Sequence, residues 1–150
     1  MFGKLIQTDD NYVSLIARVF LGLVILPHGL QKLLGIFGGA GFSGTMGFFT
    51  SQGLPAVAAL LIILGESFGA LGLIVGCISR FAAFGITLIM LGATMMVHLP
   101  NGFFMNWTGK QAGEGFEYHL LAIGLALSVM LKGSGRWSVD RMLTSRLFDK

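Results

Sequence analysis

The sequence has few charged side chains, few prolines and a single cysteine. Asp, Glu, Lys and Arg make up 11% of its 150 residues, whereas a soluble domain carries about 25%. The chain therefore cannot cover a water-facing surface, and a soluble globular protein is excluded. The lone Cys77 provides neither a disulfide framework nor a Cys-x-x-Cys pair, so the chain by itself cannot carry out dithiol chemistry.

The amino-terminal region also lacks the features of a cleavable signal. Such a signal has a basic start and a small-x-small cleavage site after its apolar part. Asp9 and Asp10 interrupt the basic start, and no such site follows the first apolar run, so we expect no cleavable signal. The pI of about 9.4 would suggest nucleic acid as a partner of a soluble protein. Here the basic residues fit membrane topology better, and we predict the lipid bilayer as partner and no nucleic acid.

Long apolar segments are what the sequence does contain, with 54% hydrophobic residues and a mean hydropathy of +0.79. A helix needs roughly 20 such residues to cross a hydrocarbon core. The candidate segments, of which the last is short, are 13–34, 54–78, 81–99 and 116–131. None shows the two-residue alternation of a transmembrane strand. We predict an all-α integral membrane four-helix bundle that forms one domain over residues 1–150.

Basic residues are unevenly distributed around these segments. Of the ten Lys and Arg residues, all but Lys32 and Lys110 lie toward the termini or at the turn between the second and third segments. Because cytoplasmic loops are enriched in Lys and Arg, this predicts both termini in the cytoplasm. The tail 132–150 is basic, and Ser138–Phe148 carries apolar residues at helical spacing. A short helix on the inner membrane surface and a frayed tail both fit this pattern.

One face of the first segment combines charged with small residues. At about 100° per residue, Arg18, Gly22, Ile25, Gly29 and Lys32 fall on one stripe. Cations facing lipid are costly, and glycines allow a neighbouring helix to approach closely. We expect this stripe to face the interior of the bundle. The alternative is that Arg18 and Lys32, which lie near the ends of the segment, extend their side chains to the membrane interface.

Glu66 is the only charged residue in the second segment. A carboxylate at that depth in a bilayer is costly and normally faces a protein interior, a cavity or a partner charge. Arg18, near the inner end of the first segment, can extend toward it, whereas Lys32, near the outer end, is expected to lie too far away. Two interpretations stay open: a buried ion pair between Glu66 and Arg18, or a carboxylate that handles protons.

All three histidines lie in the predicted outer half of the bundle, at positions 28, 98 and 119. His28 and His98, with Lys32, could hold a quinone headgroup by hydrogen bonds, or they could be ordinary polar residues of the membrane interface. The histidine spacing matches no metal-ligand motif, so we predict no metal site, and two histidines at similar depth do not favour haem. Glu117 and His119 are about 200° apart on a regular helix. Because the more polar stripe carries Glu117, we expect Glu117 to face inward and assign no role to His119.

An ordered series of short motifs runs along nearly the whole chain. They are HGLQK at 28–32, GLP at 53–55, GESFG at 65–69, SR at 79–80, HLPNGFF at 98–104, EY at 117–118 and GSGRWSVD at 133–140. Their order and spacing resemble the DoxX family of small four-helix membrane proteins. The resemblance implies a bacterial inner-membrane protein, in a family described as membrane oxidoreductases linked to quinone, thiol or oxidative-stress chemistry. It also implies that the polar signature of the family falls on Arg18, His28, Gln31, Lys32, Glu66, Arg80, His98 and Glu117.

These residues and the resemblance predict a membrane oxidoreductase component that acts on a quinone or a thiol- or sulfur-linked substrate in the outer half of the bundle. Glu66 and Arg18 are the predicted catalytic residues, and the predicted substrate-binding residues are His28, Gln31, Lys32, His98 and Glu117. The sequence contains no flavin, nicotinamide or iron–sulfur motif. Electrons would therefore come from a soluble or membrane redox partner or from a bound cofactor, for which quinone is the candidate.

Two alternative functions stay open. One is a small-molecule transporter or permeation module with Glu66 in a polar pathway, which a homo-oligomer could complete. The other is a non-catalytic subunit that anchors a soluble redox enzyme to the membrane, which the basic tail would suit.

Overall fold

The computed structural model describes residues 2–148, and all regular structure in that range is helical. This confirms the predicted all-α class. The elements are α1 (Phe2–Ile6), α2 (Tyr12–Leu34), α3 (Gly41–Ser51), α4 (Ala56–Leu64), the π-helix η1 (Gly65–Gly69), α5 (Ala70–Val75), α6 (Ser79–Ala93), the π-helix η2 (Thr94–His98), the 3-10 helix η3 (Leu99–Asn101), α7 (Glu117–Lys132) and α8 (Val139–Phe148).

Three continuous helical stretches are long and apolar enough to cross a membrane. Tyr12–Leu34 is α2, Ala56–Val75 combines α4, η1 and α5, and Ser79–Asn101 combines α6, η2 and η3. These stretches correspond to the first three predicted segments. α7 has 16 residues, fewer than the roughly 20 that a hydrocarbon core requires. The count of four spans therefore stays a prediction.

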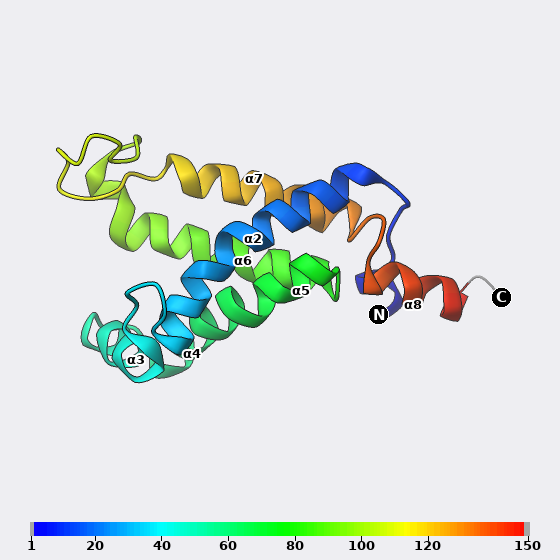
Figure 1. Ribbon diagram of the computed structural model, residues 1–150, viewed down its shortest axis with the longest axis horizontal. Coiled ribbons are helices and arrows are strands. Elements are labelled where there is room, and N and C mark those ends of the chain that lie inside the picture. Colours follow the sequence, from blue (N-terminus) through cyan, green and yellow to red (C-terminus); the bar gives the residue numbers. More distant parts are fainter. Residues whose placement is uncertain (1, 149–150) are drawn as a thin grey trace.

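The long helices run side by side along the length of the molecule (Figure 1). α2 packs against η1, α5 and α7, and α6 packs against α7. Their facing sides form a core of fully buried aliphatic side chains such as Leu21 and Ile86. The opposite sides expose large apolar side chains such as Phe20, Phe81 and Leu131. Exposing that apolar surface to water would be unfavourable, whereas contact with lipid tails, which are equally apolar, carries no such penalty.

The two ends of the molecule are built differently (Figure 1). The first and last helices, α1 and α8, pack together at one end, which we call the terminal end. The other end, which we call the loop end, carries α3 and the loop 102–116. The elements nearest the two ends of the chain, α1 and α8, thus lie on the same side of the long helices.

Asp140 joins the tail to the turn between the second and third stretches. Its side chain is buried, with Oδ1 accepting from the Ile78 N–H at 2.7 Å and Oδ2 accepting from the Ser79 N–H at 3.0 Å. The Ser134 hydroxyl donates to the same carboxylate. Ile78 has a φ of 50°, which is unfavourable for a β-branched residue, so this tight turn depends on the support of Asp140. Of the two alternatives for the tail, the helix is the one observed.

Arg18 also belongs to the terminal end. It is 1% exposed, and its guanidinium donates only to backbone carbonyl oxygens among the described residues. The acceptors are those of Ser134 (2.7 Å), Leu73 (2.8 Å), Ile74, Arg136 (3.2 Å) and Trp137 (2.7 Å). Arg18 therefore ties α2 to the end of α5 and to the segment between α7 and α8.

Candidate functional site

The centre of the candidate site is an ion pair between Lys32 of α2 and Glu66 of η1. Lys32 Nζ lies 2.5 Å from Glu66 Oε2, and the two side chains are 23% and 6% exposed. Few carboxylates are buried to this degree, and those that are require a partner charge. Lys32 supplies that charge while keeping part of its own side chain accessible.

Gly29 makes this pair geometrically feasible. A Cβ atom at Gly29 would lie 2.4 Å from both the carbonyl carbon and the carbonyl oxygen of Glu66, so only glycine lets α2 and η1 approach so closely. Gly22 makes a similar contact about two helical turns closer to the terminal end of α2, where a Cβ would lie 2.8 Å from the Ala70 carbonyl oxygen. The predicted inward orientation of the α2 stripe is confirmed for its buried members Arg18, Gly22, Ile25 and Gly29.

Glu66 lies within a π-helical turn, and so does His98. η1 covers Gly65–Gly69 and η2 covers Thr94–His98. A π-turn inserts an extra residue, which changes the direction of the side chains beyond it, and such turns occur frequently at functional sites. Two of the predicted site residues are thus carried by irregular turns in otherwise regular apolar helices. The periodicity of the sequence gave no sign of either turn.

Of the two interpretations left open for Glu66, the ion pair with Arg18 is wrong, because Glu66 pairs with Lys32. The expectation that Lys32 lies too far from Glu66 is wrong as well. The contact at Gly29 sets the height at which Glu66 meets α2. Lys32 is three positions from Gly29, about 5 Å along the helix, whereas Arg18 is eleven positions away, about 16 Å in the opposite direction. Distances along each segment from its ends do not reveal where two helices cross. Arg18 binds backbone at the terminal end instead of joining the site.

A row of aromatic and imidazole rings continues from α2 across α7 to η2. His28 lies one turn from Lys32, with its ring centroid 6.3 Å from that of Tyr118. The ring centroids of Tyr118 and His119 are 5.3 Å apart, and those of His119 and His98 are 4.1 Å apart. His98 Nδ1 then lies 2.8 Å from the Glu114 carbonyl oxygen in the loop. These rings link the vicinity of the ion pair to the surface of the loop end.

Several buried polar atoms in this region have no hydrogen-bond partner among residues 2–148. They are Ser67 Oγ, Tyr118 Oη and His119 Nδ1. Buried polar groups are normally satisfied, because an unpaired one costs about 1–3 kcal/mol. Ser67 follows Glu66 in the chain, and Tyr118 and His119 belong to the row of rings, so these atoms are available to hydrogen-bond water or a polar ligand.

The expected orientations of Glu117 and His119 are reversed in the structure. His119 is buried, at 5% exposure. Glu117 Oε1 instead accepts from the Met105 N–H at 3.1 Å and from Trp107 Nε1 at 3.2 Å. Glu117 is the first residue of α7, and helical side chains tilt toward the amino-terminal end, so its carboxylate reaches back to the loop. Glu117 organises the loop, and His119 takes the inward position.

An open hollow of about 350 Å³ lies beside Lys32 at the loop end. Its lining consists of Gln31, Lys32, Gly38, Gly39, Ala40, Thr45, Phe48 and Phe49. The aromatic rings come from α3, and the Gln31 side chain donates to the Phe37 carbonyl at 3.0 Å. A ligand in this hollow would meet the Lys32 ammonium on one side and aromatic faces on another.

The predicted site residues therefore divide into two groups. Gln31 and Lys32 line the hollow, Glu66 pairs with Lys32, and His28 and His98 are the two ends of the row of rings. Arg18 and Glu117 stabilise the two ends of the molecule. Within residues 2–148, no group of three or more His, Cys, Asp or Glu side chains is arranged to hold a metal ion.

Tyr118 and His119 are site residues that the sequence interpretation missed. One signal was available: Glu117 begins the apolar stretch of α7, so the residues after it enter the bundle while Glu117 stays at its edge. That signal depends on knowing the first residue of the helix, which is the least certain part of a prediction from sequence.

Gly29→Ala is expected to lower the free energy of unfolding by about 2 kcal/mol, because overpacking against backbone cannot be relieved by a rotamer change. The measurement is equilibrium unfolding in mixed micelles of mild detergent and dodecyl sulfate. Gly85→Ala in α6 is the matched control, since no heavy atom lies within 4 Å of a Cβ there. Equal stabilities of the two variants would contradict the close contact at Gly29.

Comparisons with known proteins place the chain among membrane proteins. The family model described as DoxX matches residues 13–99. A Bacillus subtilis protein named "Putative oxidoreductase CatD" is 31% identical over 127 residues, covering 85% of this chain and 84% of the relative. Inner membrane protein YqjF of Escherichia coli is 26% identical, covering 88% of this chain and 92% of the relative. The uncharacterized membrane protein Rv3486 of Mycobacterium tuberculosis is 28% identical, with coverages of 95% and 88%. No solved structure matches.

Proposed function

The chain belongs to the DoxX family of membrane proteins, and we propose that it is an oxidoreductase component. In this proposal it binds a quinone, or a thiol- or sulfur-linked substrate, beside Lys32 and Glu66. The observation that carries this proposal is the buried Lys32–Glu66 pair at 2.5 Å, with Lys32 also lining the hollow under α3. The name of the Bacillus subtilis relative supports redox chemistry for the family member that bears it.

The chemistry of quinone reduction suits these residues. A quinone takes up two electrons and two protons to become a hydroquinone, and its carbonyl oxygens accept hydrogen bonds. The Lys32 ammonium is a donor for one such oxygen, and Glu66, 2.5 Å behind it, returns or receives the proton that Lys32 exchanges. Phe48 and Phe49, with ring centroids 5.8 Å apart, flank the hollow with apolar faces that suit a quinone ring. The electrons are supplied by a redox partner or a bound cofactor.

We also propose that α7 forms a fourth span and that both termini lie in the cytoplasm of a bacterial cell. The uneven distribution of basic residues supports this orientation. The Escherichia coli relative named as an inner membrane protein supports a location in the inner membrane. The hollow, at the loop end, would then open toward the outer face of the inner membrane. α3, which has exposed Phe42 and Phe48, would lie in the outer interface, where aromatic side chains are favoured.

Cys77 provides a test of this orientation. It lies between the spans at the terminal end, so an impermeant maleimide is expected to label it in inverted vesicles but not in intact cells. Burial raises the pKa of the Cys77 thiol, and the nearby Asp140 carboxylate raises it further. Because the thiolate is the reactive form, labelling should be slow at pH 7 and accelerate about tenfold per pH unit up to pH 8.5.

The control for this labelling is Thr108→Cys in a Cys77→Ser background. Thr108 is exposed in the loop 102–116 and should be labelled in intact cells. Labelling of Cys77 from outside would place the termini in the periplasm and refute the proposed orientation.

The test of the proposed function starts with a visible-range spectrum and solvent extraction of the purified protein, followed by titration with a short-chain ubiquinone. We expect retained or bound quinone, with at least tenfold weaker binding in Glu66→Gln. Asp9→Asn, an exposed carboxylate at the opposite end, is the control and should bind as the wild type does. Absence of quinone binding, together with wild-type behaviour of Glu66→Gln, would refute the proposal.

A permeation module is the second candidate, and the row of rings from His28 to His98 favours it. A chain of buried polar groups can conduct a proton or a weak acid through an apolar bundle. Flux of a weak acid into liposomes that is lost in Glu66→Gln, without any quinone binding, would select this candidate over the oxidoreductase.

A further inference from the structure

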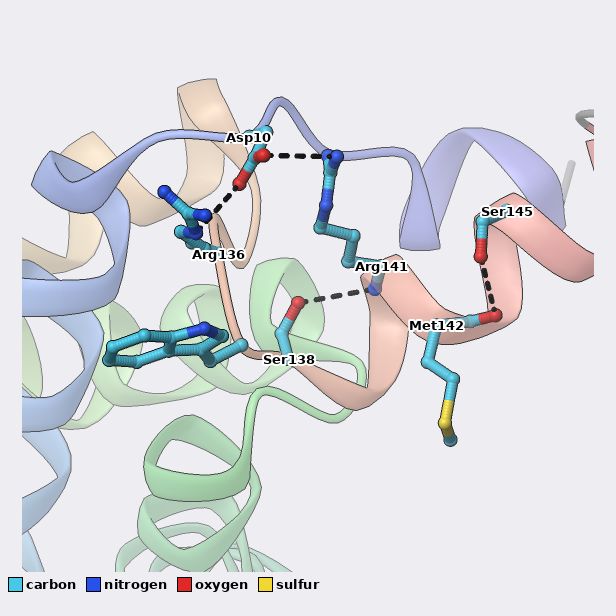
Figure 2. A pocket seen from close by; sticks show the side chains of 7 residues that line it. Asp10, Arg136, Ser138, Arg141, Met142 and Ser145 are labelled. Atoms are coloured by element: carbon cyan, nitrogen blue, oxygen red, sulfur yellow. Dashed lines mark hydrogen bonds and ion pairs between the residues drawn. The ribbon is translucent and has the colours of Figure 1, made fainter.

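A second cleft lies at the terminal end, far from the Lys32–Glu66 pair. It has a volume of about 390 Å³ and is lined by Asp10, Arg136, Trp137, Ser138, Arg141, Met142 and Ser145. Figure 2 shows the Asp10 carboxylate between the guanidinium groups of Arg136 and Arg141. The cleft is therefore formed where the amino-terminal segment before α2 meets the beginning of α8.

The walls of this cleft are held in place by bonds that do not involve its charged side chains. The Arg136 N–H donates to the Asn11 carbonyl at 3.0 Å, and the Asp140 N–H donates to the Gly76 carbonyl at 2.9 Å. Ser138 Oγ accepts from the Arg141 N–H at 3.1 Å, which fixes the first turn of α8. A ligand would thus meet a preformed site, and little ordering cost would oppose its binding.

The charge in the cleft is not balanced. One carboxylate faces two guanidinium groups, at 3.7 Å from Arg136 Nε and 3.2 Å from Arg141 Nη2. All three side chains are 41% exposed, so guanidinium N–H groups remain accessible from outside. Paired guanidinium groups match the oxygens of a phosphate through parallel charge-assisted hydrogen bonds. The residual positive charge therefore favours an anion with several oxygens.

The rim of the cleft is apolar. Trp137 is 72% exposed and Met142 is 48% exposed. Tyr12 packs edge-on against Trp137, with ring centroids 6.0 Å apart, and Arg136 lies 4.9 Å from the Tyr12 ring centroid. Exposed tryptophan and tyrosine beside arginine are typical of the headgroup region of a membrane. A soluble anion would make no use of this rim, whereas an acyl chain would cover it.

We propose that this cleft binds the phosphate headgroup of an anionic phospholipid from the leaflet on the side of the termini. Arg136 and Arg141 contact the phosphate. Trp137 and Met142 contact the glycerol and the first part of an acyl chain. Asp10 competes with the phosphate for the two guanidinium groups and so moderates the affinity. The site lies apart from the proposed redox site and does not depend on its chemistry.

Native mass spectrometry of the delipidated full-length protein in detergent tests this proposal. Dioleoylphosphatidylglycerol should bind at least fivefold more tightly than dioleoylphosphatidylcholine, which has the same chains and no net charge. Arg141→Gln should weaken phosphatidylglycerol binding about fivefold, the upper end of what one exposed charge pair contributes. Arg146→Gln removes the same charge from an exposed position of α8 outside the cleft and should change the affinity less than twofold.

Two further measurements keep the test decisive. Asp10→Asn removes the competing carboxylate and should tighten phosphatidylglycerol binding severalfold, which a misfolded variant would not do. Glycerol 3-phosphate at millimolar concentration should not displace the lipid. Equal binding of both phospholipids, or equal effects of Arg141→Gln and Arg146→Gln, would overturn the proposal. Displacement by glycerol 3-phosphate would show a site for a soluble phosphate and overturn the lipid assignment.

Discussion

Lys32→Met is expected to lower the free energy of unfolding by about 3–5 kcal/mol, the usual cost of leaving one member of a buried ion pair without its partner. The Glu66 carboxylate, with 6% of its side chain exposed, would lose the only cation that contacts it among residues 2–148. It cannot reach water by extending, because its backbone packs against Gly29. Unfolding in mixed micelles, followed by tryptophan fluorescence, measures the change.

Glu66→Gln should cost less than Lys32→Met. The Lys32 side chain is 23% exposed, and a long cationic side chain can move its ammonium toward water. The double variant Lys32→Met/Glu66→Gln should recover most of the stability lost in Lys32→Met, since replacing a buried pair by neutral groups of similar size is often close to neutral. The coupling energy in this double-mutant cycle should be at least about 2 kcal/mol.

The same variants separate the structural role of Glu66 from its chemical role. The double variant should be folded and yet should not bind quinone with wild-type affinity, because neither the ammonium nor the carboxylate remains. Additive effects of the two single changes would contradict the pair itself. A double variant that binds quinone normally would leave Glu66 as a purely structural group.

Arg18→Met is expected to lower the free energy of unfolding by about 4 kcal/mol and to release the tail. Five backbone carbonyls accept from the Arg18 guanidinium, and hydrogen bonds to a charged group contribute about 1.5–3 kcal/mol each without being additive. Arg18→Lys should be intermediate, because an ammonium has three donors and lacks the planar fork that reaches several carbonyls. Hydrogen exchange of the amides of residues 133–140 should accelerate in both variants.

The control for Arg18 is again Arg146→Gln, which removes a positive charge from an exposed position of the terminal end and should leave both stability and exchange unchanged. Quinone binding per folded molecule should also be unchanged in Arg18→Lys, because Arg18 binds the terminal end and not Glu66. Loss of quinone binding with normal protection of residues 133–140 would return Arg18 to the site that the sequence first suggested.

Much of the site was identifiable from the sequence because the cost of burying charge is independent of the fold. Glu66 lies within an apolar segment, and Lys32 and His28 lie one helical turn apart on another, so each of these polar groups is costly to expose to lipid. The partner of Glu66 was not identifiable, because an ion pair depends on where two helices cross. His119 and Tyr118 were missed because the first residue of α7 decides which of its side chains enter the bundle.

The sequence is sufficient to establish the class of the protein, because long apolar segments with scarce charge are accommodated only by membrane-spanning helices. The approximate bounds of the first three long helical stretches follow from the same apolar runs. Tertiary structure alone decided the pairing of the charges. The approach of α2 to Glu66 at Gly29, the two π-turns and the placement of Asp140 under Ile78 all depend on contacts between residues distant in the chain. Such contacts are set by packing between helices, and no period or composition within one segment encodes the height at which its neighbour crosses it.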